Sequence, residues 1–133
     1  MILASWNILS DSAVPRTQPQ SGRVIQISRA ISQLKQGDSE FIIFLCECET
    51  VENIQSIASL TNLKVLGEPS LSRSRKEYGA FLVDGETVKR SELTRHVVGR
   101  EPNSALELRY KDLSIVGVHF LSEVIKTLGE EGV

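Results

Sequence analysis

The sequence predicts a layered α/β domain in which helices pack on a sheet. Three observations support this prediction. Strand and helix signals alternate over the first 66 residues, the apolar run at 41–46 is uninterrupted, and the second half contains short β-favouring segments between turn signals. An uninterrupted apolar run of this length is typical of a strand that is buried on both faces.

The first strand and helix follow from local composition. Residues 2–9 contain the β-favouring Ile and Trp and no breaker, which predicts a strand. After a polar loop at 10–20, Ser21 is expected to cap a helix that ends near Gln36, just before Gly37. The side chains expected on its buried face are Val24, Ile27, Ile31 and Leu34.

A buried strand at 41–46 and a second helix come next. Thr50 is expected to cap this helix, and Glu52 lies in its first turn, where a carboxylate favours the helix dipole. A third strand is expected at 63–66, which completes a β-α-β-α-β succession. The inward side chains expected on the helix are Ile54, Ile57, Ala58 and Leu60.

The second half is expected to consist mainly of hairpins. Asp84-Gly85 and Lys111-Asp112 are the predicted two-residue turns. A short helix is expected near the end of the sequence, at about 122–129. The strands expected on either side of the two turns are 79–84 with 86–98, and 105–110 with 113–120.

Length, charge and hydropathy limit the class of protein. The 133 residues are expected to form a single domain, 1–133, and a net charge of −2 gives no global basic field that would favour nucleic acid. No apolar run is long enough to span a membrane, and no secretory signal is expected, because the first residues lack a basic segment followed by a longer apolar one. The two cysteines, Cys46 and Cys48, are two residues apart on an expected strand and so poorly placed for an unstrained disulfide, and a reduced, cytoplasmic protein is expected. A zinc site formed by these cysteines and a histidine is disfavoured, because Cys-x-Cys lacks the usual ligand spacing.

Three polar residues lie at or near the carboxyl ends of apolar segments, namely Asn7, Glu47 and His119. Each has a simpler interpretation: a turn or capping group, the first solvated residue after a strand, and a core histidine. Their shared position favours a common site, since ligands bind at this edge of layered α/β sheets. A carboxylate and an amide would suit Mg²⁺, and an imidazole would donate to a phosphoryl oxygen.

Four motifs in order resemble the endonuclease/exonuclease/phosphatase superfamily, which includes pancreatic-type deoxyribonucleases and abasic-site endonucleases. They are SWN at 5–7, FIIFLCE at 41–47, GAFLV at 79–83 and GVHFLS at 117–122. The resemblance implies hydrolysis of a phosphodiester or phosphomonoester that depends on Mg²⁺ or Mn²⁺. It implies that Glu47 binds the metal, that Asn7 organises the metal site beside it, and that His119 contacts the scissile phosphate.

Glu49 is the rival of Glu47, which we prefer because it ends the apolar run at the family's spacing. Arg73, Arg75, Lys76 and Tyr78 are candidates for holding substrate phosphates, although the basic loop is also consistent with an ordinary solvated cluster. The substrate would be nucleic acid or a small phosphorylated molecule, because a family resemblance constrains the reaction more than the substrate.

Family members are about twice as long, and their second half contains Gly-Asp-Phe-Asn and Ser-Asp-His motifs that this sequence lacks. The other histidine, His96, lies in an unrelated context. The resemblance therefore implies half of a four-layer α/β/β/α sandwich: one mixed, mostly antiparallel sheet with helices on its outer face. Such a half would expose an apolar sheet face, so we expect either a missing C-terminal half or a sheet-to-sheet homodimer. The alternative function is that of a non-catalytic binding or assembly domain.

Overall fold

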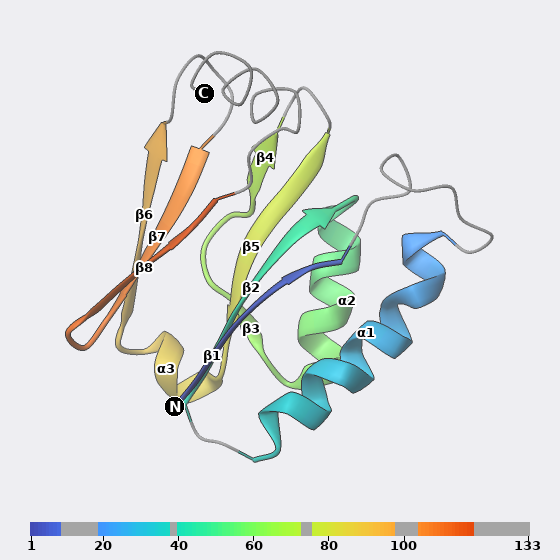
Figure 1. Cartoon of the computed structure of the whole chain (residues 1–133), viewed down its shortest axis with the longest axis horizontal. Coiled ribbons are helices and arrows are strands. Elements are labelled where there is room, and N and C mark those ends of the chain that lie inside the picture. Colours follow the sequence, from blue (N-terminus) through green and yellow to red (C-terminus); the bar gives the residue numbers. More distant parts are fainter. Residues whose placement is uncertain (9–18, 38–39, 73–75, 98–103, 119–133) are drawn as a thin grey trace, which may run out of the picture.

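The computed structural model describes residues 1–8, 19–37, 40–72, 76–97 and 104–118. They form three layers: two helices, a mixed sheet of five strands, and an antiparallel sheet of three strands (Figure 1). This confirms the predicted α/β (α+β) class with helices packed on a sheet. Within these ranges, no helix has the length and apolar character needed to cross a membrane.

The larger sheet has the strand order β1 (Ile2–Asn7), β2 (Phe41–Cys48), β5 (Glu77–Val83) and β3 (Lys64–Val65), and β4 (Ser70–Ser72) also pairs with β5. β1 and β2 are parallel, whereas β2, β3 and β4 are each antiparallel to β5. The carboxyl ends of β1 and β2 therefore lie at the same edge of the sheet as the beginning of β5.

Two helices, α1 (Gln20–Lys35) and α2 (Val51–Thr61), cover one face of this sheet. The predicted cap of α2 is confirmed, because the Thr50 side chain accepts a hydrogen bond from the Asn53 amide at 3.0 Å. The predicted cap of α1 is wrong: the helix begins at Gln20, and the preceding proline provides an extended entry without a side-chain cap. Helix residues in the core between helices and sheet are Val24, Ile27, Ile31, Ile54, Ile57 and Ala58.

Two leucines expected in the core are exposed instead. Leu34 of α1 is 48% exposed and Leu60 of α2 is 56% exposed, whereas Ser28 of α1 is buried. Periodicity locates the centre of the buried face of a helix, but the width of that face depends on how closely the neighbouring elements approach. Both leucines lie at the border of the buried face.

The second sheet consists of β6 (Ser91–Val97), β7 (Ser104–Tyr110) and β8 (Leu113–Gly117). The predicted hairpin around Lys111 is confirmed, since β7 and β8 pair antiparallel across that turn. This sheet packs on the face of the larger sheet that the helices leave open. The buried apolar residues between the two sheets include Ile42, Phe44, Cys46, Phe81, Val83, Leu106, Leu108 and Tyr110.

The apolar face that we expected to be exposed is therefore covered from within the chain. The strands β6, β7 and β8, expected to extend one sheet, form a second sheet instead. Because the second sheet already covers this face, the face does not require a sheet-to-sheet partner. The predicted helix at 122–129 and the last residues of the predicted strand 113–120 lie outside the described residues.

Phe44 fixes the distance between the two sheets. A Cβ atom added to Gly117 of β8 would overlap the Phe44 ring, and one added to Gly79 of β5 would lie 2.9 Å from the ring's Cζ atom. The Phe44 ring also lies 5.0 Å from the Phe81 ring, centroid to centroid, in a tilted arrangement. The two glycines thus provide the space that a large aromatic side chain needs between the sheets.

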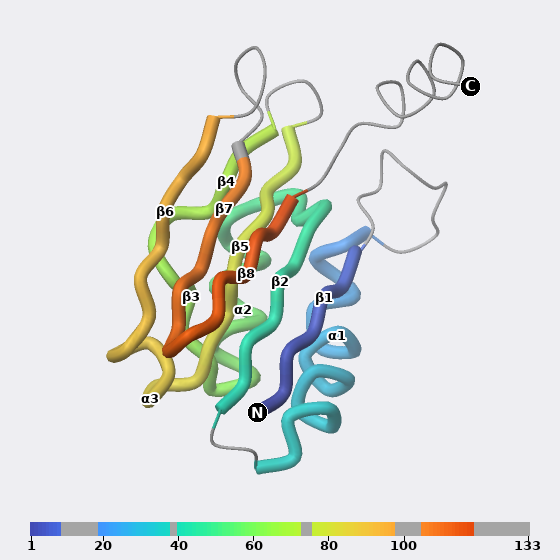
Figure 2. Tube along the Cα trace, turned by 60° about the vertical axis from the view of Figure 1, so that its left-hand side comes forward, coloured from blue at the N-terminus to red at the C-terminus, as the bar shows by residue number. Residues whose placement is uncertain are grey.

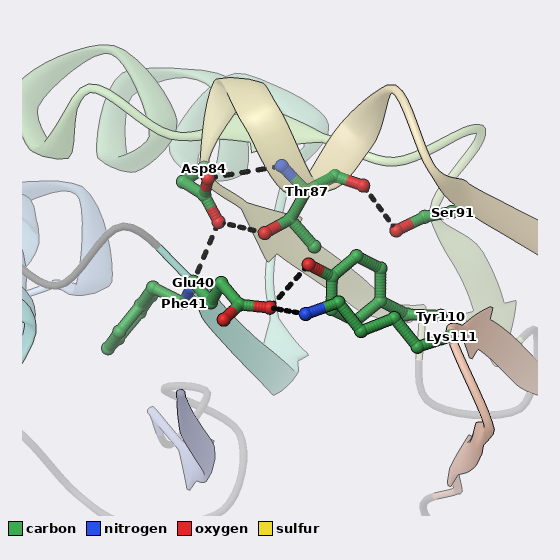
Figure 3. A network of polar contacts seen from close by, with 7 residues as sticks. All are labelled: Glu40, Phe41, Asp84, Thr87, Ser91, Tyr110 and Lys111. Carbon is green, nitrogen blue, oxygen red and sulfur yellow. Dashed lines mark hydrogen bonds and ion pairs between the residues drawn. The ribbon is translucent and has the colours of Figure 1, made fainter.

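The predicted hairpin turn at Asp84-Gly85 is wrong. Asp84 instead caps a short helix, α3 (Gly85–Val88), by accepting hydrogen bonds from the amides of Glu86 and Thr87 at 3.2 and 3.1 Å. Its other carboxylate oxygen accepts from the amide of Phe41 at 2.9 Å and from the Thr87 hydroxyl (Figure 3). The contact with Phe41 makes Asp84 a junction between the start of β2 and the passage to the second sheet.

Glu40 makes a parallel connection beside this junction. The Lys111 ammonium lies 2.7 Å from the Glu40 carboxylate, which also accepts a hydrogen bond from the Tyr110 hydroxyl (Figure 3). Because Glu40 precedes β2 and the other two residues begin the β7–β8 turn, the two sheets are joined by polar contacts at this end as well.

We expect Gly117→Ala to destabilise the protein by about 1–3 kcal/mol, the usual cost of forcing extra volume into a packed core. Phe44→Leu in the same chain should recover part of this loss, because the smaller side chain makes room for the new methyl group. Urea unfolding of the two single variants and the double variant gives the coupling energy. Additive effects would contradict the proposed packing of Phe44 on Gly117.

Asp84→Ala should cost about 2–4 kcal/mol, from the lost cap and the unpaired Phe41 amide. Burial raises the pKa of Asp84, but hydrogen bonds from Phe41, Thr87 and Glu86 outweigh it, so the pKa lies below its usual value. The stabilisation is then present above the unfolded pKa, near 3.9, and is lost as the pH falls through the folded pKa.

Urea unfolding between pH 7 and pH 3 measures this dependence. The variant should lose less stability on acidification than the native protein does. Asp112→Ala, which removes an exposed turn aspartate, is the control and should change stability by less than about 0.5 kcal/mol. Equal acid sensitivity of the native protein and Asp84→Ala would contradict the role given to this carboxylate.

Candidate functional site

The parallel pairing of β1 and β2 brings two of the predicted site residues together. Asn7 is the last residue of β1 and lies directly opposite Cys46, the residue before Glu47. The ladder continues one step further, where the Ile8 amide donates to the Cys46 carbonyl at 3.2 Å. Asn7 and Glu47 are therefore neighbours at the carboxyl edge of the sheet, as the sequence predicts.

β2 contains a β-bulge at this edge. Leu45 pairs with Ala80 and Cys48 pairs with Tyr78, so Cys46 and Glu47 together oppose the single residue Gly79. Glu47 has a φ angle of 58°, in the left-handed region that non-glycine residues rarely adopt. The other described non-glycine residues with positive φ lie at helix ends or in turns, namely Gln36, Asn62, Lys76 and Lys111. In the described part of the chain, Glu47 alone adopts this conformation inside a strand.

Glu47 is buried as well as strained. It is 6% exposed, so the interpretation as the first solvated residue after β2 is wrong. Glu77, the first residue of β5, is 2% exposed at the same edge. One buried carboxylate therefore lies in the bulge and a second lies beside it, and both raise the pKa of Cys46, although less than burial does.

The two cysteines belong to the core on opposite faces of β2. Burial, Glu47 and Glu77 raise the pKa of Cys46 to about 11. Burial, Cys46 and Glu77 raise the pKa of Cys48 further. Both thiols are thus protonated at neutral pH and act as small apolar side chains.

A buried amide pair supports the bulge from the helix side. Gln20 of α1 bonds to the backbone of Glu47 and Glu49, and Asn53 of α2 donates to the Gln20 side-chain oxygen at 3.1 Å. Gln20 is fully buried and Asn53 is 8% exposed. These residues connect both helices to the strand end that carries Glu47.

The remaining predicted site residues are only partly described. Tyr78 lies opposite Cys48, next to the bulge, and its half-buried side chain packs against the core between the helices and the sheet. Lys76 is exposed at the same edge, in the turn before β5. Arg73, Arg75 and His119 lie outside the described residues.

The end of β8 lies beside β1. A hollow of about 290 Å³ is lined by Leu3, Ala4 and Ser5 of β1, by 115–118 and by Phe44. Figure 1 and Figure 2 show that β8 runs in roughly the same direction as β1 and β2. The described part of β8 therefore runs toward the edge occupied by Asn7 and Glu47.

His96 belongs to a different surface. Its Nε2 atom lies 2.8 Å from the Glu107 carboxylate on the outer face of the second sheet, where Arg109 also contacts Glu107 at 3.2 Å. Hydrogen bonds from Ser114, His96 and Arg109 lower the pKa of Glu107 to about 2. This cluster joins three strands and lies away from the bulge.

The donor set at the bulge fits a hard divalent cation. In the described ranges, no three His, Cys, Asp or Glu side chains converge as a ready-made metal cage. Mg²⁺ does not need such a cage, because it retains several waters and binds through one or two carboxylates together with substrate phosphates. Glu47 and Asn7 would supply the oxygen ligands for such a site.

Sequence reasoning missed Gln20 and Glu77. Gln20 lies at the start of a helix after a polar loop, and Glu77 follows a basic loop, so both resemble solvated residues. Their burial depends on strand pairing and helix docking, which no local pattern reveals. Periodicity could not have identified either residue.

The comparisons with known proteins add no relative to this description. The chain matches no protein-family model, no curated protein and no solved structure.

Proposed function

We propose that this chain is a divalent-metal-dependent phosphoesterase domain, or the N-terminal portion of one, with its metal site at the Glu47 bulge. The observation that carries the proposal is the position of Glu47: a buried carboxylate, in a left-handed conformation inside a strand, next to Asn7 at the carboxyl edge. Such strain costs about 1–3 kcal/mol and clusters at functional sites.

The proposed roles follow from the chemistry of each side chain. Glu47 and Asn7 hold the metal through their oxygen atoms. When bound, Mg²⁺ or Mn²⁺ would supply Lewis-acid polarisation of a phosphoryl oxygen. His119 donates a hydrogen bond to the phosphate as negative charge develops on it.

The basic turn before β5 supplies the proposed substrate contacts. Lys76 lies at the same sheet edge as the bulge, and Tyr78 lies opposite Cys48. Arg73 and Arg75 add positive charge in the same segment of sequence. A phosphate ester of nucleic acid or of a small phosphorylated molecule would fit these groups, since cationic side chains hold phosphates irrespective of the rest of the substrate.

Glu47→Gln should abolish the proposed activity while preserving the fold. We expect Mg²⁺ binding, measured by isothermal titration calorimetry, to weaken by at least about tenfold, since even changes outside the ligand shell cost that much. Mg²⁺-dependent hydrolysis of bis(p-nitrophenyl) phosphate should be lost in parallel. Glu49→Gln is the matched control and should retain both properties.

The same position separates a functional role from a structural one. Glu47→Gly relieves the left-handed strain, so stability should be unchanged or increased by up to about 1 kcal/mol. A loss of stability in urea unfolding would indicate that Glu47 serves the fold. Unchanged hydrolysis in Glu47→Gln would refute the site assignment.

A second candidate function is that of an assembly domain. It is favoured by the exposed surface where β8 lies beside β1, which we call the seam. Leu3, Val116 and Val118 are 51%, 56% and 41% exposed along this seam. The segment 113–118 contains no charged residue, whereas β6 has the charged side chains that usually protect edge strands. A second copy of the chain would cover this apolar strip by an isologous contact.

Val116→Lys tests the assembly function. If β8 is the interface, the native protein should sediment as a dimer and the variant as a monomer with an unchanged circular dichroism spectrum. In a symmetric dimer the two introduced lysines would face each other at the centre of the strip, and their like charges would repel. A native protein that remains monomeric at high micromolar concentration would defeat this candidate. Mg²⁺ binding serves as the control and should not change.

A further inference from the structure

Gln20 occupies an unusual position for an amide side chain. It is the first residue of α1 and is fully buried, while the other end of its helix reaches the surface. Its Nε2 atom donates to the Glu47 carbonyl at 2.8 Å, and its Oε1 atom accepts from the Glu49 amide at 2.8 Å. The two hydrogen bonds span the residue between them, Cys48.

This pattern matches the way in which a parallel strand would bond to β2. In a parallel ladder, one residue donates to the carbonyl before its partner and accepts from the amide after it. β1 supplies such bonds up to Ile8, whose amide donates to the Cys46 carbonyl. Beyond that point the side chain of Gln20 takes the place of the missing strand.

The Gln20 side chain, which takes the place of a strand, holds the bulge next to Glu47, the residue whose backbone is strained. Glu47 keeps its φ of 58° between the last bond from β1 and the first bond from Gln20. The side-chain amide of Asn53 donates to Gln20 Oε1 at 3.1 Å, and the backbone amide of Asn53 donates to the Thr50 hydroxyl, which caps α2. Both helices thereby determine where the Glu47 backbone lies, and hence the direction of its side chain.

We infer that Gln20 is the positioning residue of the proposed metal site, with Asn53 orienting its amide. This inference rests on the proposed function, because it assigns to Gln20 the task of holding Glu47 in the conformation that binds Mg²⁺. Gln20 itself does not touch the metal. Removing its amide should leave the ligands present but misplaced.

The test is Gln20→Leu, which keeps the size of the side chain and removes both hydrogen bonds. Isothermal titration calorimetry with MgCl₂ should show binding that is about tenfold weaker, the lower end of the usual effect of an outer-shell residue. Hydrogen exchange of the Glu49 amide, followed by NMR, should accelerate because that amide loses its acceptor. Asn53→Ala is the milder variant and should weaken Mg²⁺ binding about threefold, since it leaves the two backbone contacts in place.

Thr61→Val is the matched control for a general loss of stability. It removes a buried hydrogen bond from the Thr61 hydroxyl to the Ile57 carbonyl, at the opposite end of α2 from Asn53. At equal folded fraction, fixed by urea unfolding, its Mg²⁺ affinity should stay within about twofold of the native value.

Each outcome decides the question. Weaker binding in Gln20→Leu with unchanged binding in Thr61→Val supports the positioning role. Native-like binding in Gln20→Leu, or an equal loss in Thr61→Val, overturns it and leaves the proposed function intact. If the native protein binds no Mg²⁺, the proposed function fails, and the positioning role fails with it. If Gln20→Leu does not fold, the same comparison is made with Asn53→Ala, and unchanged affinity there overturns the inference.

Discussion

Burial of β2 on both faces is the constraint on which the rest of the structure depends. All eight residues from Phe41 to Cys48 are buried, with helices on one side and the second sheet on the other. Alternate side chains therefore belong to two different cores. The helix-side core contains Ile43 and Leu45, and the core between the sheets contains Ile42 and Phe44. A central strand of this kind fixes the positions of its neighbours, because each must cover one of its faces or pair with one of its edges.

The candidate site follows from the way in which this strand ends. A regular strand would continue to alternate, but the bulge places both Leu45 and Cys48 in the helix-side core. The extra residue, Glu47, absorbs the change in the left-handed conformation. Burial, strain and a carboxylate thus coincide at one residue. The polar groups around it lie on β1, α1, α2 and β5, so the geometry of the site depends on the packing of both helices against the sheet.

Several features could be predicted from the sequence because their causes are local. The Thr50 cap needs only the three residues that follow it, and the β7–β8 hairpin needs only a turn and two β-favouring segments. Asp84-Gly85 shows where local reasoning fails, since an Asp-Gly pair suits both a hairpin turn and a helix cap. Asp84 caps a helix here because the amide of Phe41, 43 residues away at the start of β2, needs its carboxylate as an acceptor.

What the sequence determined is the β-α-β-α-β succession of the first 66 residues, the burial of the strand at its centre on both faces, and the meeting of Asn7 with Glu47 at one edge. These follow from periodicity, from capping, and from the rule that parallel strands share a carboxyl edge. Only the tertiary structure decided that β6, β7 and β8 form a second sheet, that Glu47 is buried in a bulge, and that Gln20 replaces a strand beside it. These features depend on which backbone groups lack a partner after the chain has folded, and distant residues satisfy those groups.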